Sequence, residues 1–173
     1  MLHMPALPAE LRQDPATAIG ALLLATAAAV ILAALAFEHI GGYIPCPLCL
    51  QQRYAYYAGI PALAAALALL RSGRTLPAAG VFLLVGAAFV VNAGLGVYQA
   101  GAEWKFWEIA SCAASGGLPD FDINKLNIKN APICGVASWR FLGLSFAGWN
   151  VVASAVLALG ASTAALKAWR RLP

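Results

Sequence analysis

The stretch "YIPCPLCLQQRYAYYAGIPALAAALALL", residues 43 to 70, joins a CxxC motif to a run of apolar residues. The run from Tyr54 to Leu70 approaches the ~20 residues with which a helix crosses the hydrocarbon core of a bilayer. Similar windows occur at Ala16 to Phe37, Leu76 to Tyr98 and Ala147 to Trp169. Such segments must satisfy their own backbone hydrogen bonds in lipid. The sequence therefore predicts an all-α membrane protein, a bundle of four transmembrane helices.

The composition supports the membrane class, since 62% of the 173 residues are hydrophobic and only 10% are charged. Soluble domains carry about 25% charged residues. No internal repeat, low-complexity linker or charge block divides the chain. We therefore expect a single four-helix membrane domain over residues 1–173, with spans at about 16–37, 54–70, 76–98 and 147–169. Two outer segments, about 38–53 and 99–146, would connect the spans on one side.

The first window has a second interpretation, because Ala34-Leu35-Ala36 imitates the cleavage site of a secretory signal. A signal core is only about 7–15 residues long and follows a basic start, whereas this run is longer and only Arg12 precedes it. Asp14-Pro15 is also typical of a helix N-cap followed by proline at the first helical position. The sequence favours a first membrane span.

Basic residues predict the orientation of the bundle. One side combines both termini with the turn between the second and third spans, and it carries the whole net charge of +4. Short cytoplasmic segments are enriched in Lys and Arg, so we expect both termini in the cytoplasm and the two cysteine-bearing segments in the periplasm. Because these charges lie at span ends, we attribute them to topology and lipid contact, and we expect no nucleic-acid partner. The basic residues on this side are Arg12, Arg71, Arg74, Lys167, Arg170 and Arg171.

All the cysteines of the chain fall in the two outer segments. Disulfides persist in the periplasm, whereas cytoplasmic thiols are kept reduced, so this distribution favours disulfide chemistry on the outer side. Cys46 and Cys49 lie where the second span begins, and Pro47 suits a first helical turn. The positive end of the helix dipole lowers the pKa of a thiol there. The CxxC motif is therefore a candidate dithiol/disulfide couple.

Arg53 shares a helix face with the two cysteines, because positions 46, 49 and 53 follow the i, i+3, i+7 pattern. An arginine near the apolar region at the outer end of a span is costly and needs a reason. It either extends along its stem to the interface, or it donates hydrogen bonds to a polar ligand in the membrane or to a thiolate. Tyr56 and Tyr57 would give such a ligand flat walls, although aromatic residues are also common at membrane interfaces.

Cys112 and Cys134 lie in the long outer segment, and three interpretations are open for them. A disulfide between them would be a structural staple that restricts the loop. Alternatively, the two form an exchangeable redox pair that meets a soluble thiol protein. A zinc site of four cysteines is the weakest interpretation, because the spacing contains one CxxC and no second. We therefore expect no metal.

Several motifs in order resemble the DsbB family of disulfide-forming quinone reductases. They are "CPLCLQQR" at the start of the second span, "GVYQAGAEWKFW" at residues 96–107, two further cysteines, and "WRFLGLSFAGWN" at residues 139–150. The likeness covers most of the chain. One position departs from the family pattern: Gln99 lies where the family often has histidine. Glutamine forms hydrogen bonds but does not titrate.

The resemblance implies a direction of electron flow in the bacterial inner membrane. A reduced thioredoxin-like protein of the periplasm, DsbA, would attack Cys112 and release Cys134. Cys134 would then attack Cys46 and free Cys49. The Cys49 thiolate would pass electrons to a membrane quinone, ubiquinone or menaquinone, beside which Arg53 matches the family's arginine. The resemblance thus implies a protein-dithiol:quinone oxidoreductase.

Other functions remain open from the sequence. The vitamin K epoxide reductase-like family also couples thiols to quinones, but its CxxC follows the loop cysteines, whereas here the CxxC comes first. A membrane scaffold with static disulfides belongs to a different class. A DsbB-like variant with a dedicated substrate is a further alternative.

Overall fold

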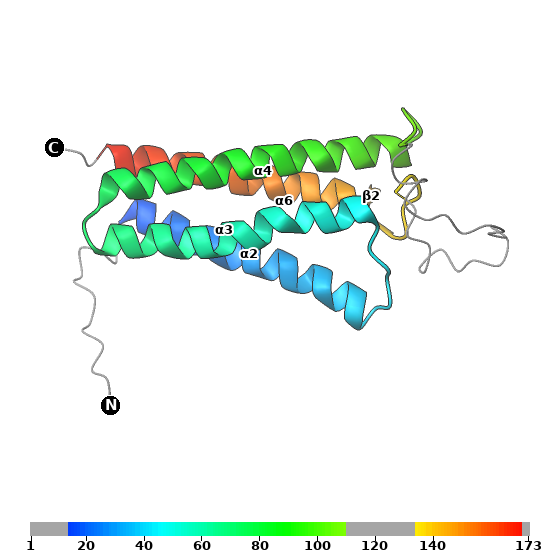
Figure 1. The fold of residues 1–173 in the computed structure, drawn as a ribbon, viewed down its shortest axis with the longest axis horizontal. Helices are drawn as coiled ribbons and strands as arrows, with labels where there is room; N and C mark the ends of the chain where they lie inside the picture. Colours follow the sequence, from blue (N-terminus) through cyan, green and yellow to red (C-terminus); the bar gives the residue numbers. More distant parts are fainter. Residues whose placement is uncertain (1–13, 110–133, 171–173) are drawn as a thin grey trace, which may run out of the picture.

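The computed structural model describes residues 14–109 and 134–170, and four long helices make up most of it (Figure 1). Each of them is long and apolar enough to cross a membrane. The predicted all-α architecture, a four-helix transmembrane bundle, is therefore confirmed. The helices are α2 (Pro15–His39), α3 (Pro47–Arg71), α4 (Thr75–Glu103) and α6 (Phe146–Trp169).

Each helix contains its predicted window, but two helices extend well beyond it. Helix α3 begins at Pro47, before the window that starts at Tyr54, and α4 continues to Glu103, past Tyr98. Hydropathy marks only the part of a helix that lies in lipid, whereas caps and tertiary contacts determine where the helix ends. The outer segments are consequently shorter than the predicted 38–53 and 99–146.

Local signals in the sequence account for the helix starts. The Oδ1 atom of Asp14 accepts a hydrogen bond from the Ala16 amide at 2.8 Å, and Pro15 occupies the first helical position, as predicted. At the start of α6, the Ser145 hydroxyl accepts a hydrogen bond from the Gly148 amide at 3.2 Å. Both caps satisfy backbone amides that have no partner within the helix.

The helices run up and down, so the start of α2, the α3–α4 connection and the end of α6 lie together at one end (Figure 1). Helix α4 shares its largest interface with α6, while α3 and α6 hardly touch. Gly20 marks a close contact of α2 with α3 and α4: a Cβ atom there would lie 2.9 Å from both the Leu67 and the Phe82 side chains. Toward the opposite end α2 diverges from the other helices.

A short β-hairpin leads into α6 at that opposite end. Strand β1 (Arg140–Phe141) pairs antiparallel with β2 (Leu144–Ser145). Leu142 and Gly143, which connect them, both have positive φ, at 50° and 84°. This combination is typical of the two-residue turns that match the twist of a hairpin. The hairpin delivers Ser145 to the start of α6.

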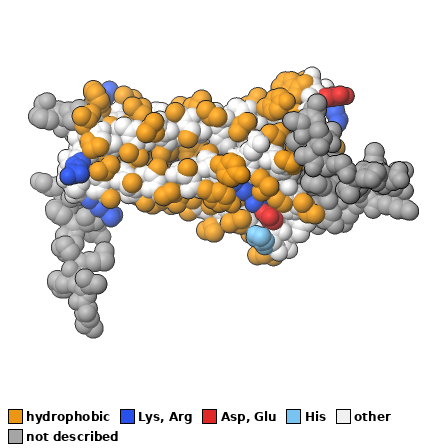
Figure 2. Space-filling view, in the orientation of Figure 1, with side chains coloured by type: hydrophobic (Ala, Val, Ile, Leu, Met, Phe, Trp, Pro, Cys, Tyr) orange, Lys and Arg blue, Asp and Glu red, His pale blue; other side chains and the backbone are white. Residues whose placement is uncertain are grey.

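The flank of the bundle is mostly hydrophobic, as expected for a surface in contact with lipid (Figure 2). Basic side chains gather at the end where α2 begins. Among the described residues, this end carries four of the six basic residues used to predict the orientation, whereas Arg12 and Arg171 lie outside the described residues. The four are Arg71, Arg74, Lys167 and Arg170.

Candidate active site

Cys46 and Cys49 lie together at the start of α3, where the sequence placed them. Cys46 is the N-cap residue, and its Sγ atom accepts a hydrogen bond from the Cys49 amide at 3.2 Å. Pro47 takes the first helical position, where its missing N–H costs nothing. Both cysteines are free thiols in the structure. The motif thus forms a dithiol built on a helix N-terminus.

The two sulfurs differ in their surroundings. Cys46 is buried, with 4% of its surface exposed, and Cys49 is partly exposed. The side-chain hydrogen bond between the Cys46 thiol and the Cys49 sulfur, together with burial, raises the pKa of the Cys46 thiol well above its ordinary value. The lowering effect expected from the helix N-terminus is present at Cys46, through the backbone amides of Leu48 and Cys49, but the other effects outweigh it. The Cys46 thiol therefore keeps its proton at neutral pH.

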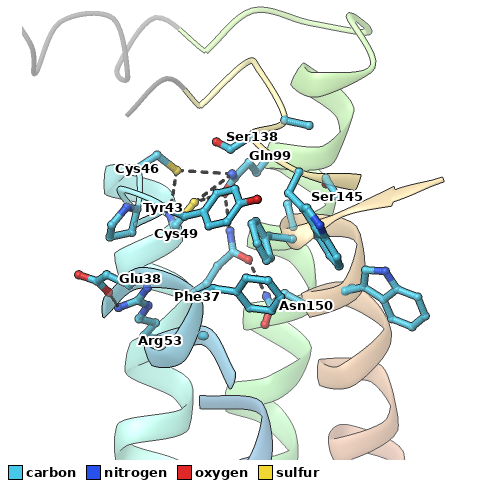
Figure 3. Close-up of a pocket in the computed structure, with 18 of the residues that line it drawn as sticks. Phe37, Glu38, Tyr43, Cys46, Cys49, Arg53, Gln99, Ser138, Ser145 and Asn150 are labelled. Atoms are coloured by element: carbon cyan, nitrogen blue, oxygen red, sulfur yellow. Dashed lines mark hydrogen bonds and ion pairs between the residues drawn. The ribbon is translucent and has the colours of Figure 1, made fainter. Parts of the chain in front are cut away.

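Gln99, near the end of α4, contacts both sulfurs. Its Nε2 atom lies 3.4 Å from Cys46 Sγ and 3.3 Å from Cys49 Sγ, and its side chain is buried (Figure 3). The protonated Cys49 thiol can instead donate to Gln99 Oε1, at 3.8 Å. A neutral amide therefore accommodates both the thiol and the thiolate form of Cys49. Among the described residues, this amide is the side-chain donor next to both sulfurs.

A chain of buried and partly buried amides continues from Gln99 toward the middle of the bundle. Gln52 Nε2 donates to Gln99 Oε1 at 2.7 Å, and Asn150 Nδ2 donates to Gln52 Oε1 at 2.6 Å. Asn150 Oδ1 in turn accepts from the Tyr56 hydroxyl at 2.8 Å and from Asn92 at 3.3 Å. Gln99 and Gln52 thus each accept a hydrogen bond from the amide farther from the cysteines and donate one toward the cysteines. Hydrogen bonds aligned in this way polarise one another.

A pocket of about 430 Å³ lies directly beside this amide chain. Its walls come from the diverging half of α2, from α3 and from α6, and the cysteines lie at its outer end. Phe37, Trp139 and Phe146 form an aromatic wall, with ring centroids 4.8–5.3 Å apart. The volume falls within the roughly 300–1,000 Å³ typical of small-molecule sites. The apolar walls are lined mainly by Val30, Ile31, Ala33, Ala34 and Ala153.

Arg53 lines this pocket, as its helix face predicts, and forms an ion pair with Glu38 at the end of α2 (Figure 3). Only 12% of the Arg53 side chain and 25% of the Glu38 side chain is exposed. The bond joins Nη1 to one carboxylate oxygen, and arginine has further N–H donors. The sequence interpretation did not identify Glu38 as this partner. Tyr56 also lines the pocket, whereas Tyr57 is 48% exposed and does not.

Cys134, from the long outer segment, packs beside the dithiol. It is fully buried and belongs to the same apolar cluster as Cys46, which Leu48, Ala102 and Ile109 complete. It is disulfide-bonded. Cys112 lies outside the described residues. Within the described ranges, no group of three or more His, Cys, Asp or Glu side chains is placed to hold a metal. The structure thus brings a cysteine of each outer segment into one cluster.

A transmembrane four-helix bundle with a dithiol at a pocket defines a membrane protein of the thiol oxidoreductase class. The family model described as "Disulfide bond formation protein DsbB" matches residues 16–164. The chain belongs to the DsbB family. It is accordingly a disulfide-generating membrane oxidoreductase, a multi-pass protein of the inner membrane.

Individual relatives agree with the family match. The chain is 33% identical over 150 residues to disulfide bond formation protein B of Paracidovorax citrulli, covering 79% of this chain and 82% of the relative. The protein of the same name from Polaromonas naphthalenivorans is 33% identical over 156 residues, with coverage of 82% and 88%. That of Marinobacter nauticus is 33% identical over 138 residues, with coverage of 72% and 77%. No solved structure matches the chain.

Proposed function

We propose that the protein is a protein-dithiol:quinone oxidoreductase that reoxidises a periplasmic thioredoxin-like protein of the DsbA type. The observation that carries the proposal is the shared cluster of Cys46 and Cys134 next to the pocket. Thiol–disulfide exchange requires direct contact between the attacking sulfur and the disulfide. A cluster that holds sulfurs from both outer segments supports exchange between them.

The proposed reaction begins in the long outer segment. A thiolate of the partner attacks Cys112 in a Cys112–Cys134 disulfide, and Cys134 leaves as a thiolate. Cys134 then attacks Cys46 in a Cys46–Cys49 disulfide, and Cys49 leaves. Attack on Cys46 is favoured because it shares the cluster with Cys134 and leaves the charge on Cys49, beside the Gln99 amide. The partner's second thiol then completes the partner's own disulfide and releases Cys112. Cys112 attacks Cys134 in the Cys46–Cys134 disulfide, which re-forms the Cys112–Cys134 disulfide and leaves Cys46 and Cys49 as a dithiol.

A quinone fits the pocket by its chemistry. Its ring and isoprenoid tail are apolar and match walls formed by membrane-spanning residues, while its carbonyl oxygens need donors. Arg53 supplies N–H groups that Glu38 does not use, and Cys49 lines the same pocket. A bound quinone accepts two electrons and two protons, which balances oxidation of the Cys46–Cys49 dithiol to a disulfide.

The proposed orientation places both termini in the cytoplasm and the cysteines at the periplasmic end. The basic residues at the end of the bundle away from the dithiol support it. A periplasmic dithiol would meet soluble thiol proteins in the compartment where disulfides persist.

Trapping the partner tests this function. Cys134→Ser leaves Cys112 without its exchange partner, so a mixed disulfide between Cys112 and the physiological dithiol protein should accumulate in cells. Non-reducing electrophoresis and mass spectrometry would identify it. The matched control is Cys112→Ser, which removes the attacked sulfur and should trap nothing. The absence of any adduct with Cys134→Ser, or an equal amount with Cys112→Ser, would contradict the relay.

A further inference from the structure

Glu103, the last residue of α4, is a buried acid that the proposed reaction does not yet use. It is 8% exposed, and its Oε1 atom lies 3.4 Å from Gln99 Nε2. Its Oε2 atom is buried and has no hydrogen-bond partner among the described residues. A buried carboxylate with so few donors is costly when ionised. Its position behind Gln99 places it one amide group away from both sulfurs.

The Gln99 amide cannot satisfy all the acceptors around it. Its Nε2 atom carries two hydrogens but faces three acceptors at 3.3–3.4 Å: Cys46 Sγ, Cys49 Sγ and Glu103 Oε1. The three acceptors therefore compete for two N–H groups, and the Cys49 thiolate and the Glu103 carboxylate, which share this neutral amide, also repel each other electrostatically. A negative charge on one of them favours the neutral form of the other.

Gln99 cannot relieve this competition by turning its amide over. Its Oε1 accepts from Gln52 Nε2, and Gln52 Oε1 is itself occupied by Asn150 Nδ2. A flip of Gln99 would place two N–H groups against each other. The amide chain thus fixes the NH₂ group toward the acceptors.

Neighbouring charges leave the competition in place. Arg140 interacts electrostatically with Glu103, but it is exposed, its guanidinium lies 5.3 Å from the Trp104 ring centroid, and it donates to Gly143. The Ser145 hydroxyl, on β2, also interacts favourably with the carboxylate, but it is neutral. Arg53 is already paired with Glu38. Within the described residues, no ion pair neutralises Glu103, so two negative charges at this site would lack a fixed counter-charge.

We propose that Glu103 is the proton acceptor of the dithiol and takes the proton that leaves Cys49 when this thiol ionises. The step breaks the S–H bond of Cys49 and forms an O–H bond on Glu103, so Cys49–SH and Glu103–COO⁻ become Cys49–S⁻ and Glu103–COOH. The net charge of the site remains −1, and no electrons move in this step. The inference rests on the proposed function, in which Cys49 is the electron donor.

This assignment accounts for both protons of the dithiol. One is held on Glu103 and the other on Cys46, while the Cys49 thiolate faces the pocket. Oxidation of the pair then releases two electrons and these two protons, as many as a quinone takes up. The proton on Glu103 lies next to the pocket, because Glu103 is itself one of the residues that line it.

The pH profile of Cys49 alkylation tests the proposal without quinone or partner. The parent protein for this experiment carries Cys46→Ser, because serine keeps a good helix cap and leaves Cys49 as the free thiol. Its rate of reaction with iodoacetamide is measured across roughly pH 4 to 10, which spans the ordinary ionisation range of carboxyl and thiol groups. If Cys49 and Glu103 share one charge, the rate rises in two steps separated by a plateau.

Glu103→Gln assigns these steps. The proposal expects this variant to lose one step, so that Cys49 titrates once. Glu108→Gln is the matched control, because Glu108 is an exposed acid just beyond the end of α4, and it should keep both steps. A single step in the parent, or two steps that persist in Glu103→Gln, would overturn the proposal. A purely structural role of Glu103 would leave the number of steps unchanged.

Infrared spectroscopy gives a second test, which does not require a Glu103 variant. At the plateau pH, the parent should show the C=O band of a buried protonated carboxyl. Cys49→Ala in the same background should lose this band, because the proton donor is gone. A band of equal intensity in both proteins, or in neither, overturns the coupling. Neither readout depends on quinone reduction, so failure of the proposed function is recorded separately by the trapping experiment.

Discussion

The two ends of the helix bundle bury different kinds of side chain. Where α2 begins, most of the fully buried residues are small and apolar, such as Ala16, Ala78 and Ala164, and the buried polar residue there is the helix cap Asp14. At the dithiol end, the buried residues include Gln52, Gln99 and Glu103. Close contact between small residues holds transmembrane helices together, whereas buried polar groups in a membrane protein are costly and typical of functional sites. Helix packing thus dominates one end of the bundle and chemistry the other.

Cys49→Ser should show the largest difference between the two ends, because it should abolish activity and leave stability almost unchanged. Quinol formation with a reduced thioredoxin-like partner should fall to background, since the variant has no electron-donating thiolate. Thermal unfolding should hardly change, because Cys49 is only partly buried and the apolar packing of the other end is untouched. Residual activity above the uncatalysed rate would show that a group other than Cys49 donates the electrons.

The inequality of the two sulfurs predicts selective alkylation. Because the pKa of Cys46 is raised, at pH 7 its thiol is protonated to a greater extent than an ordinary cysteine, and it reacts slowly. Substoichiometric iodoacetamide on the fully reduced protein should label Cys49 over Cys46 by on the order of tenfold or more, since each pKa unit changes the thiolate ratio tenfold. The preference should narrow as the pH rises toward the Cys46 pKa. Peptide mass spectrometry measures it, and equal labelling at pH 7 would refute the asymmetry.

Arg53→Ala should raise the quinone KM by roughly ten- to a hundredfold, in keeping with loss of a hydrogen bond from a charged donor, worth about 1.5–3 kcal/mol. The quinone KM of Arg53→Lys should lie between those of the parent protein and Arg53→Ala, because lysine keeps the charge but not the planar guanidinium group. Glu38→Gln keeps the guanidinium and should change KM less than Arg53→Ala. Quinol formation as a function of quinone concentration measures these values, and an unchanged KM in Arg53→Ala would remove Arg53 from the quinone site.

We call the end of the bundle where α2 begins the packing end. Its stability should depend on the size of the buried side chains and not on their polarity. Gly20→Val would force atoms against Leu67 and Phe82 and lower the free energy of unfolding by about 1–3 kcal/mol. Gly80→Ala is the control, because among the described residues nothing beyond its own turn of helix lies within 4 Å of the place its Cβ would take, and it should stay within about 1 kcal/mol of the parent. Denaturation in detergent provides the measurement. If both glycine variants behaved alike, close packing would not explain this end.

The sequence predicted the packing end better than the dithiol end. Long apolar windows suffice to locate membrane helices, and Asp14-Pro15 and Cys46-Pro47 are local start signals. The partners of the sulfurs and of Arg53 are contacts between residues far apart in the chain, so no local pattern contains them. Gln99 was noticed only as a departure from the family pattern, and Glu38 was not identified as the partner of Arg53.

One signal for the amide chain was nevertheless present in the sequence. Asn92 and Asn150 interrupt apolar windows, and an amide facing lipid is costly, so each predicts a polar partner on another helix. In the structure the amide nitrogen of Asn92 lies 3.3 Å from the amide oxygen of Asn150. The pairing with Gln52 needed the structure, because Gln52 belonged to a segment predicted to lie outside the spans.

The cap formed by Cys46 links the chemistry to the backbone of α3. The sulfur that accepts the Cys49 amide hydrogen bond is also the sulfur attacked in the proposed exchange. Each turnover would therefore perturb and restore an N-cap, an interaction worth roughly 0.5–2 kcal/mol for good caps. Protection of the Cys49 amide against hydrogen exchange would then rise and fall with the oxidation state. Hydrogen exchange in the first turn of α3 would thus report the oxidation state of the cysteine pair.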